Sequence, residues 1–227
     1  MLYSFCAQSN CTDGEFPEAR LTRDPSGNLY GTTNEGGANG EGAVFKLRPP
    51  PAGQTLWTEI VLYSFCARSG RNCTDGSFPR AGLIRDVSGN LYGTTEDGGA
   101  GGGGTVFELT PPAPGKTLWT ETVLYSFCVQ GGSNCTDGSF PVADLFRDAS
   151  GNLFGTTSEG GANSVVCGGG TAFELVTPAK LVDLRDRDRS AEPGSPIGQS
   201  VICEGDSAAV EAGAHAGSAV SEAAKKP

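Results

Sequence analysis

Apolar and polar residues alternate near residue 60, and this alternation predicts a β-strand over residues 56–65. Val61, Tyr63 and Phe65 occupy alternate positions and therefore share one face of that strand. Three further short segments follow, of which the last two are rich in β-branched and aromatic residues. These strands are expected at residues 82–85, 90–95 and 105–110. The pattern therefore predicts a unit of four short strands.

A tight turn is expected between the second and third of these strands. Asp86 can accept hydrogen bonds from nearby backbone amides, and Gly89 tolerates the positive φ that a tight turn requires. The same pair of residue types recurs at two other places in the chain, so we expect one hairpin turn in each unit. The turn residues are Asp24, Gly27, Asp86, Gly89, Asp148 and Gly151.

The unit occurs three times in the chain. Leu-Tyr-Ser-Phe-Cys begins at Leu2, Leu62 and Leu124, and Cys-Thr-Asp-Gly follows at Cys11, Cys73 and Cys135. Gly-Asn-Leu-aromatic-Gly-Thr-Thr begins at Gly27, Gly89 and Gly151, and Gly-x-x-Phe-x-Leu begins at Gly42, Gly104 and Gly170. The order predicts a repeat array over residues 1–178. Its units are residues 1–50, 51–112 and 113–178, and a low-complexity, disordered tail is expected over residues 179–227.

Four short strands per repeat are typical of a β-propeller blade, so the predicted fold is all-β and propeller-like, with three blades. A blade cannot bury both of its faces alone, so neighbouring units must stack. Closed propellers usually have about four to eight blades. Three units therefore predict either a fragment of a larger propeller or a homodimer in which a second copy completes the ring. A β-trefoil-like fold is the alternative.

The chain resembles a known tandem repeat, because four sub-motifs match it in order over about three quarters of the sequence. They are Asp-x-Ser-Gly-Asn-Leu-Tyr-Gly-Thr-Thr, a Gly-Gly loop, Gly-Thr-Val-Phe-Glu-Leu and Trp-Thr-Glu-Thr-Val-Leu-Tyr-Ser-Phe. This succession is similar to the GloVer repeat of bacterial choice-of-anchor surface or secreted proteins. The resemblance implies an extracellular, propeller-like protein and brings no catalytic residues with it. No secretory leader or anchor segment is recognisable, which favours the fragment over a ring completed by a second copy.

Charge and composition narrow the classes of partner. The chain has 16 basic and 26 acidic residues and a net charge of −10, which argues against a nucleic-acid partner. No apolar run approaches the roughly 18 residues of a membrane helix, so we expect no transmembrane segment. The 35 glycines do not recur at every third position, which excludes a collagen-like chain.

Six of the eight cysteines form three local pairs, and each pair flanks the loop that follows a Leu-Tyr-Ser-Phe strand. The pairs are Cys6 with Cys11, Cys66 with Cys73, and Cys128 with Cys135. We predict a disulfide in each loop and therefore an oxidising compartment. Free buried thiols are the first alternative and zinc ligation is the second, although the spacing is not Cys-x-x-Cys and the single histidine is His215. Cys167 and Cys203 have no counterpart in the repeat.

Carboxylates recur at fixed places in the units, and we expect them to be structural. They are Asp13, Asp75 and Asp137, together with Glu59 and Glu121 and the turn aspartates named above. Catalysis by two carboxylates needs unlike environments, whereas residues repeated once per unit have like environments. The Asp-x-Ser-Gly-Asn segment lacks the full set of oxygen ligands of a calcium loop. We therefore expect no catalytic residue, no bound cofactor and no metal site.

Two further sets of residues have both a structural and a functional interpretation. Trp57, Trp119, Tyr30 and Tyr92 could stack on sugars, but we expect them to pack between units. Asn10, Asn72 and Asn134 each begin an Asn-Cys-Thr triplet that matches the N-glycosylation pattern. We expect these asparagines to be loop residues instead.

The function we expect is a non-enzymatic extracellular scaffold, located outside the cell or at its surface. A glycan-binding or protein-binding module at the cell surface is the alternative. A polysaccharide-active enzyme comes third, because its polar cluster should occur in one unit alone and the array contains no such cluster.

Overall fold

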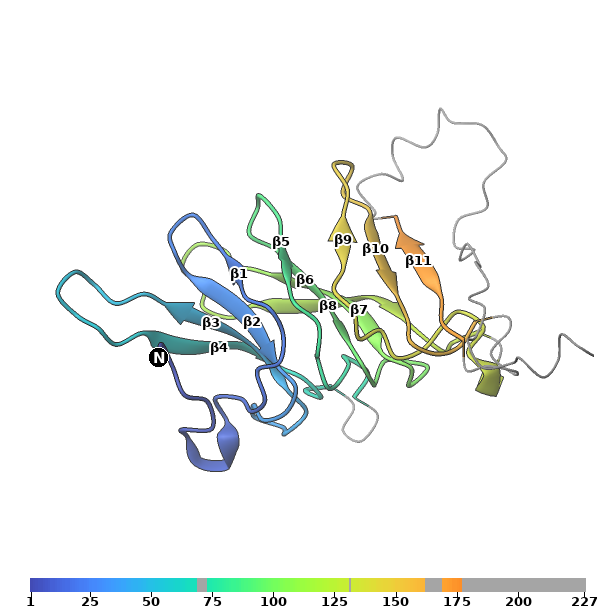
Figure 1. The fold of residues 1–227 in the computed structure, drawn as a ribbon, viewed down its shortest axis with the longest axis horizontal. Coiled ribbons are helices and arrows are strands. Elements are labelled where there is room, and N and C mark those ends of the chain that lie inside the picture. The colour runs from blue at the N-terminus through green and yellow to red at the C-terminus, as the bar shows by residue number, and fades with distance from the viewer. Residues whose placement is uncertain (69–72, 131, 162–168, 177–227) are drawn as a thin grey trace, which may run out of the picture.

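The computed structural model describes residues 1–68, 73–130, 132–161 and 169–176. Within these ranges the chain is all-β, as predicted, and its strands form three antiparallel sheets that follow one another along the chain (Figure 1). The described residues include no helix that is long and apolar enough to span a membrane. The predicted tail over residues 179–227, with His215 and Cys203, lies outside the described residues, and so does Cys167.

Each of the first two sheets has four strands in sequential order. The first sheet consists of β1 (Thr22–Arg23), β2 (Leu29–Thr33), β3 (Ala43–Arg48) and β4 (Thr58–Ser64). The second sheet consists of β5 (Ile84–Arg85), β6 (Leu91–Thr95), β7 (Thr105–Thr110) and β8 (Thr120–Ser126). The described strands of the third sheet are β9 (Phe146–Arg147), β10 (Leu153–Thr156) and β11 (Ala172–Leu175). The expected strands at 82–85, 90–95 and 105–110 thus lie at β5, β6 and β7.

The sheets are out of phase with the sequence repeat by one strand. We expected the strand at 56–65 to open the second unit, but β4 instead pairs with β3 as the last strand of the first sheet. Tyr63 lies opposite Val44, and Tyr125 of β8 lies opposite Val106 in the same way. The short connection of residues 49–57 favours a hairpin with the preceding strand, whereas the path from β4 to β5 passes through the cysteine loop. The boundary between the first two sheets therefore lies after β4, one strand later than the boundary of the sequence repeat.

Consecutive sheets bury a shared apolar core. Tyr30 and Val44 of the first sheet form one cluster with Phe65, Leu83 and other residues associated with the second sheet. A matching cluster joins the second sheet to the third. At the centre of each cluster two phenylalanines meet edge to face, with ring centroids 5.1 Å apart for Phe65 and Phe107. Burial of apolar area between sheets is therefore what holds the array together.

A glycine in the middle of each central strand permits close packing. A Cβ at Gly93 would lie 2.7 Å from Phe107 and 2.9 Å from Leu83. Both side chains belong to the core between the first two sheets, so even an alanine at this position would displace them. The contact with the Phe107 ring thus explains the glycine of the Gly-Thr-Thr motif.

Candidate functional site

The three cysteine pairs are disulfides, and each closes a short loop directly after the Leu-Tyr-Ser-Phe segment. The Cα–Cα separations are 4.0 Å for Cys6–Cys11, 4.1 Å for Cys66–Cys73 and 4.1 Å for Cys128–Cys135. All six cysteines have positive φ, between 40° and 62°, so the backbone turns back on itself at both ends of each bridge. The result is three similar bridged loops, one for each copy of the motif.

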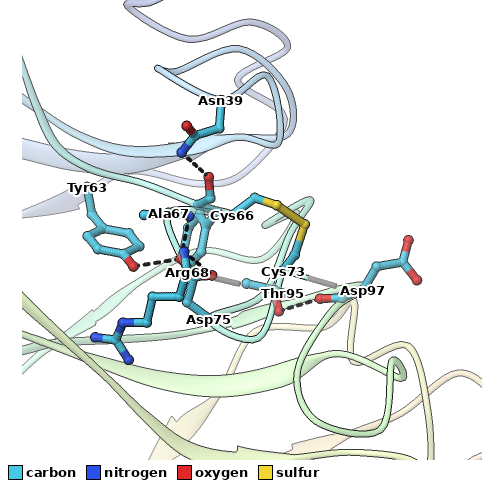
Figure 2. The surroundings of a disulfide bond; sticks show 10 residues. Asn39, Tyr63, Cys66, Ala67, Arg68, Cys73, Asp75, Thr95 and Asp97 are labelled. Carbon is cyan, nitrogen blue, oxygen red and sulfur yellow. Dashed lines mark hydrogen bonds between the residues drawn. A yellow bond between two sulfur atoms is a disulfide. The ribbon is translucent and has the colours of Figure 1, made fainter. Parts of the chain in front are cut away.

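A buried aspartate follows each bridged loop, two residues after its second cysteine, and Figure 2 shows the middle one. Asp75 is fully buried. Its carboxylate accepts hydrogen bonds from the Tyr63 hydroxyl at 2.7 Å and from the backbone amides of Ala67 at 2.9 Å and Arg68 at 3.2 Å. The aspartate thus connects the end of strand β4 to the loop that follows it.

The same arrangement occurs in the other two loops. Asp13 accepts from the Tyr3 hydroxyl at 2.8 Å and from two backbone amides, and Asp137 accepts from Tyr125 and two amides in the same pattern. Burial alone would raise the pKa of Asp13, but the amide and hydroxyl hydrogen bonds outweigh burial and hold that pKa below its usual value. Burial and the neighbouring Asp13 carboxylate together raise the pKa of Tyr3 to about 12.

The bridged loop is also tied to the preceding sheet. The side-chain amide of Asn39, from the glycine-rich loop between β2 and β3, donates to the carbonyl oxygen of Phe65 at 2.8 Å (Figure 2). On its other side, the amide of Gly99 donates to the carbonyl oxygen of Cys73 at 3.0 Å. The middle loop is therefore part of the junction between the first two sheets.

Two glutamates lie next to these aspartates, which the repeat pattern alone did not show. Glu121 of β8 is buried, and its Oε2 lies 3.0 Å from Nη2 of Arg68, although neither carboxylate oxygen accepts a hydrogen bond of good geometry. Burial raises its pKa to about 7, with Arg68 opposing the shift and Asp75 adding to it. In the first sheet, burial and then Asp13 raise the pKa of Glu59 to about 7 as well.

The two carboxylates at the first loop have unlike environments, contrary to what repetition led us to expect. Asp13 has a lowered pKa and Glu59 a raised one, and separated values are the property that acid–base pairs need. However, the Asp13 oxygens are engaged by Tyr3 and two amides, and Oε1 of Glu59 is buried without a hydrogen-bond partner. The hydrogen bonds of Asp13 therefore hold the loop, whereas the buried, unpartnered oxygen of Glu59 disfavours the charged form of that residue.

Stability should fall as the pH rises from about 4.5 to about 7, and Glu59 should contribute to that fall. Its pKa in the folded chain is raised to about 7 from an ordinary value of 4.5, so within this window the folded chain binds a proton that the unfolded chain has released. We expect Glu59→Gln to reduce the loss by about 1–2 kcal/mol. Urea unfolding at several pH values measures this difference. Glu18→Gln, at an exposed position, is the control. If Glu59→Gln loses as much stability over this pH range as the wild type does, Glu59 does not have a raised pKa.

Removing the middle disulfide should destabilise the chain moderately. Cys66 and Cys73 are seven residues apart, and a closed loop of that size contributes about 2.5 kcal/mol in the chain-entropy model. The double variant Cys66→Ser, Cys73→Ser should lower the free energy of unfolding by that amount in a denaturant titration. A reductant should then destabilise the variant less than it destabilises the wild type. Equal responses to the reductant would mean that the bridge is not formed.

The predicted turn residues lie in the hairpins between the first two strands of each sheet. Asp24 accepts hydrogen bonds from the backbone and side-chain nitrogens of Asn28 at 2.9 and 2.7 Å and from the Tyr30 hydroxyl at 3.0 Å. Burial alone would raise the pKa of Asp24, but the Asn28 and Tyr30 hydrogen bonds keep it low. Asp86 and Asp148 make the equivalent contacts to Asn90 and Asn152. Gly27, Gly89 and Gly151 have φ of 85°, 93° and 90°.

One polar cluster takes one residue from each of the three units and was not predicted from the sequence. Nε of Arg20 contacts a carboxylate oxygen of Asp144, and the amide of Gly82 donates to the other oxygen. These three residues occupy equivalent positions in the three repeats, so the cluster cannot be found by searching one unit at a time. A Cβ at Gly82 would lie 2.7 Å from Cγ of Arg20, which explains the glycine. Aligning the repeats and looking for their variable positions would have identified it.

The structure also locates the residues that the sequence suggested for sugar stacking, N-glycosylation or zinc binding. Tyr30 and Tyr92 are buried between sheets and are not available to stack on sugars, whereas Trp57 and Trp119 are half-buried. Asn10 lies in the first bridged loop with φ of 58°, and Asn72 lies outside the described residues. Ligand atoms of Cys6, Cys11 and Glu15 lie within 4.8 Å of one another, but two of them are disulfide sulfurs, which are not the thiolates that zinc requires.

Comparison with known proteins agrees with the internal repetition. A family model described as the Gloeobacter/Verrucomicrobia repeat matches residues 1–201. The match covers all three sheets and confirms the resemblance on which the sequence interpretation relied. A search of curated proteins finds no match to the chain.

Proposed function

Because the chain belongs to the Gloeobacter/Verrucomicrobia repeat family, we propose that it is a non-enzymatic extracellular repeat module that serves as a scaffold. The observation that carries this proposal is the bridged loop, which is built three times from the same parts. In each copy a disulfide closes the loop, and the aspartate accepts hydrogen bonds from the tyrosine hydroxyl and from two loop amides. Groups that are used in this way stabilise a surface and do not process a substrate.

The disulfides support the extracellular part of the proposal. Bridges of this kind form and persist in oxidising compartments and are rare in the cytosol. Alkylating the protein directly from culture medium, from the cell surface and from the cell interior would locate the oxidised pool. We expect chain with all three bridges outside the cell. Fully alkylated cysteines in every fraction would contradict an extracellular role.

A binding module for glycans or proteins is the second candidate, and one observation favours it. Arg20, Gly82 and Asp144 differ from one another although the residues around them repeat, and they meet at one point on a rigid support. Variable positions on a constant scaffold are where binding specificity is commonly located. The side chains of Arg20 and Asp144 are 62% and 39% exposed, so a ligand can reach them.

Thermal denaturation in the presence of glycan and protein panels separates the two candidates. A ligand that binds the folded chain raises its melting temperature, and a pure scaffold shows no shift with any member of the panels. If a ligand is found, Arg20→Ala should abolish the shift while Val87→Ala, a fully exposed turn position, should preserve it. Turnover of a polysaccharide in the same samples would overturn the non-enzymatic proposal.

A further inference from the structure

The same pair of sheet faces packs together twice within the chain. One face, here called the trailing face, meets the next sheet along the chain, and its members are buried. They are Tyr30, Thr32 and Val44 in the first sheet and Tyr92, Thr94 and Val106 in the second. The opposite or leading face meets the preceding sheet and is buried as well. Its members are Phe65, Leu83 and Leu91 for the second sheet and Phe127, Leu145 and Leu153 for the third.

The two ends of the array leave these faces uncovered. On the leading face of the first sheet, Leu21 is 46% exposed, and Phe5 and Leu29 are half-buried. They are the repeat equivalents of Leu83, Phe65 and Leu91, which other sheets bury completely. The first sheet thus presents an apolar face without a partner among the described residues.

The trailing face of the third sheet also has no cover from the residues that the structure describes. Ala172 and Thr156 are exposed and Phe154 is half-buried, whereas the equivalent valine, threonine and tyrosine of the first two sheets are buried. The leading face of the first sheet has the same residue types as the leading faces that are buried twice in this chain. The trailing face of the third sheet keeps the threonine and has Phe154 and Ala172 in place of the tyrosine and the valine. The two uncovered faces lie at opposite ends of the array (Figure 1).

The edge of β11 has a matching counterpart as well. In the first two sheets the third strand pairs with a strand that ends in Leu-Tyr-Ser-Phe, with Tyr63 opposite Val44 and Tyr125 opposite Val106. Among the described residues, β11 pairs with β10 alone. Residues 2–5 carry the same Leu-Tyr-Ser-Phe sequence and form no strand. By the same register, Tyr3 would lie opposite Ala172.

We propose that two copies of this chain dock head to tail, so that the leading face of each covers the trailing face of the other and residues 2–5 of one copy extend the sheet at β11 of its partner. The N-terminus lies by the first sheet and β11 at the far end of the array, so one copy does not supply both (Figure 1). Two unlike faces that meet in two equal contacts close a ring. Two copies supply six sheets, which falls within the usual range of about four to eight for closed propellers.

The molar mass of the full, oxidised chain in solution tests the proposal. Size-exclusion chromatography with light scattering over a concentration series should give twice the chain mass of 23.2 kDa, without larger species. A single-chain mass at every concentration would overturn it. A mass that keeps rising with concentration would also overturn it, because the contacts would then not close.

Charge substitutions on the two faces provide a sharper test. Leu21→Glu and Ala172→Lys change exposed positions of the single chain, so each variant should keep its fold, which circular dichroism verifies. Each should raise the dimer dissociation constant at least about tenfold, because a charge is buried without a partner. Val87→Lys, at a fully exposed turn, is the matched control and should leave the mass unchanged.

Mixing the two variants distinguishes docking from a general loss of solubility or fold. In a mixed pair, one contact brings together the two substituted side chains, which carry opposite charges, and the other contact has the wild-type residues. The mixture should therefore recover the mass of two chains, although neither variant does so alone. A mixture that remains monomeric while the control dimerises would overturn the head-to-tail arrangement.

Discussion

Asp75→Ala should lower the free energy of unfolding by about 3–5 kcal/mol. The substitution removes the acceptor for the Tyr63 hydroxyl and for the amides of Ala67 and Arg68, all of which lie at a fully buried carboxylate. Each buried donor that is left without a partner costs about 1–3 kcal/mol, and hydrogen bonds to charged groups are the stronger ones. Urea unfolding of the oxidised chain, followed by intrinsic fluorescence, measures the change.

Two control variants separate the role of the carboxylate from general effects of substitution. Asp75→Asn keeps one acceptor oxygen and the side-chain volume, so it should cost clearly less than Asp75→Ala. Asp86→Ala removes similar hydrogen bonds from a hairpin that is partly open to solvent, where water can replace them, and should cost about 1 kcal/mol. If Asp75→Ala is no more costly than Asp86→Ala, the buried aspartate does not organise the loop.

Phe65→Ala should destabilise the chain by about 3–5 kcal/mol and weaken the contact between the first two sheets. Phe65 is fully buried, packs edge to face on Phe107, and lies in the cluster that contains Tyr30 and Val44. Deleting its ring leaves a cavity between sheets that are joined by other loops, so the surroundings can close it only in part. Thermal or urea unfolding measures the loss, and a second transition would show that the sheets unfold separately.

Leu118→Ala is the matched control for loss of a large apolar side chain. Leu118 is 82% exposed, so its removal should change the free energy of unfolding by no more than about 0.5 kcal/mol. Equal effects of the two substitutions would mean that the cluster around Phe65 does not form the core between the sheets.

Strands and turns were predictable because their causes are local. The β-branched and aromatic residues of segments 90–95 and 105–110 identified β6 and β7 to within a residue at each end. Asp86 and Gly89 lie in a turn because the carboxylate reaches amides within four residues and the glycine accepts φ of 93°. The second strand was the least clear in the sequence and is two residues long in the structure, Ile84–Arg85.

The candidate site was predictable only in part. Cys66 and Cys73 could be paired from their spacing, because both flank one loop. By contrast, the contact of Arg20 with Asp144 joins residues 124 positions apart, and nothing in the local sequence indicates it. The charged neighbours of Glu121, Arg68 and Asp75, could not be predicted either. The alternation of a strand shows on which face of the sheet a side chain lies, but not which charged groups of the next loop approach that face.

By itself, the sequence determined the all-β class, the threefold repetition, the hairpin turns and the pairing of neighbouring cysteines, because each follows from side-chain alternation or from contacts within a few residues. The tertiary structure alone decided that β4 closes the first sheet, that Asp75 and Glu121 approach each other, and that Arg20 reaches Asp144. These features depend on how whole sheets pack. The free energy of that packing comes from apolar area buried between segments that are far apart in the chain, and no local pattern records which segments will meet.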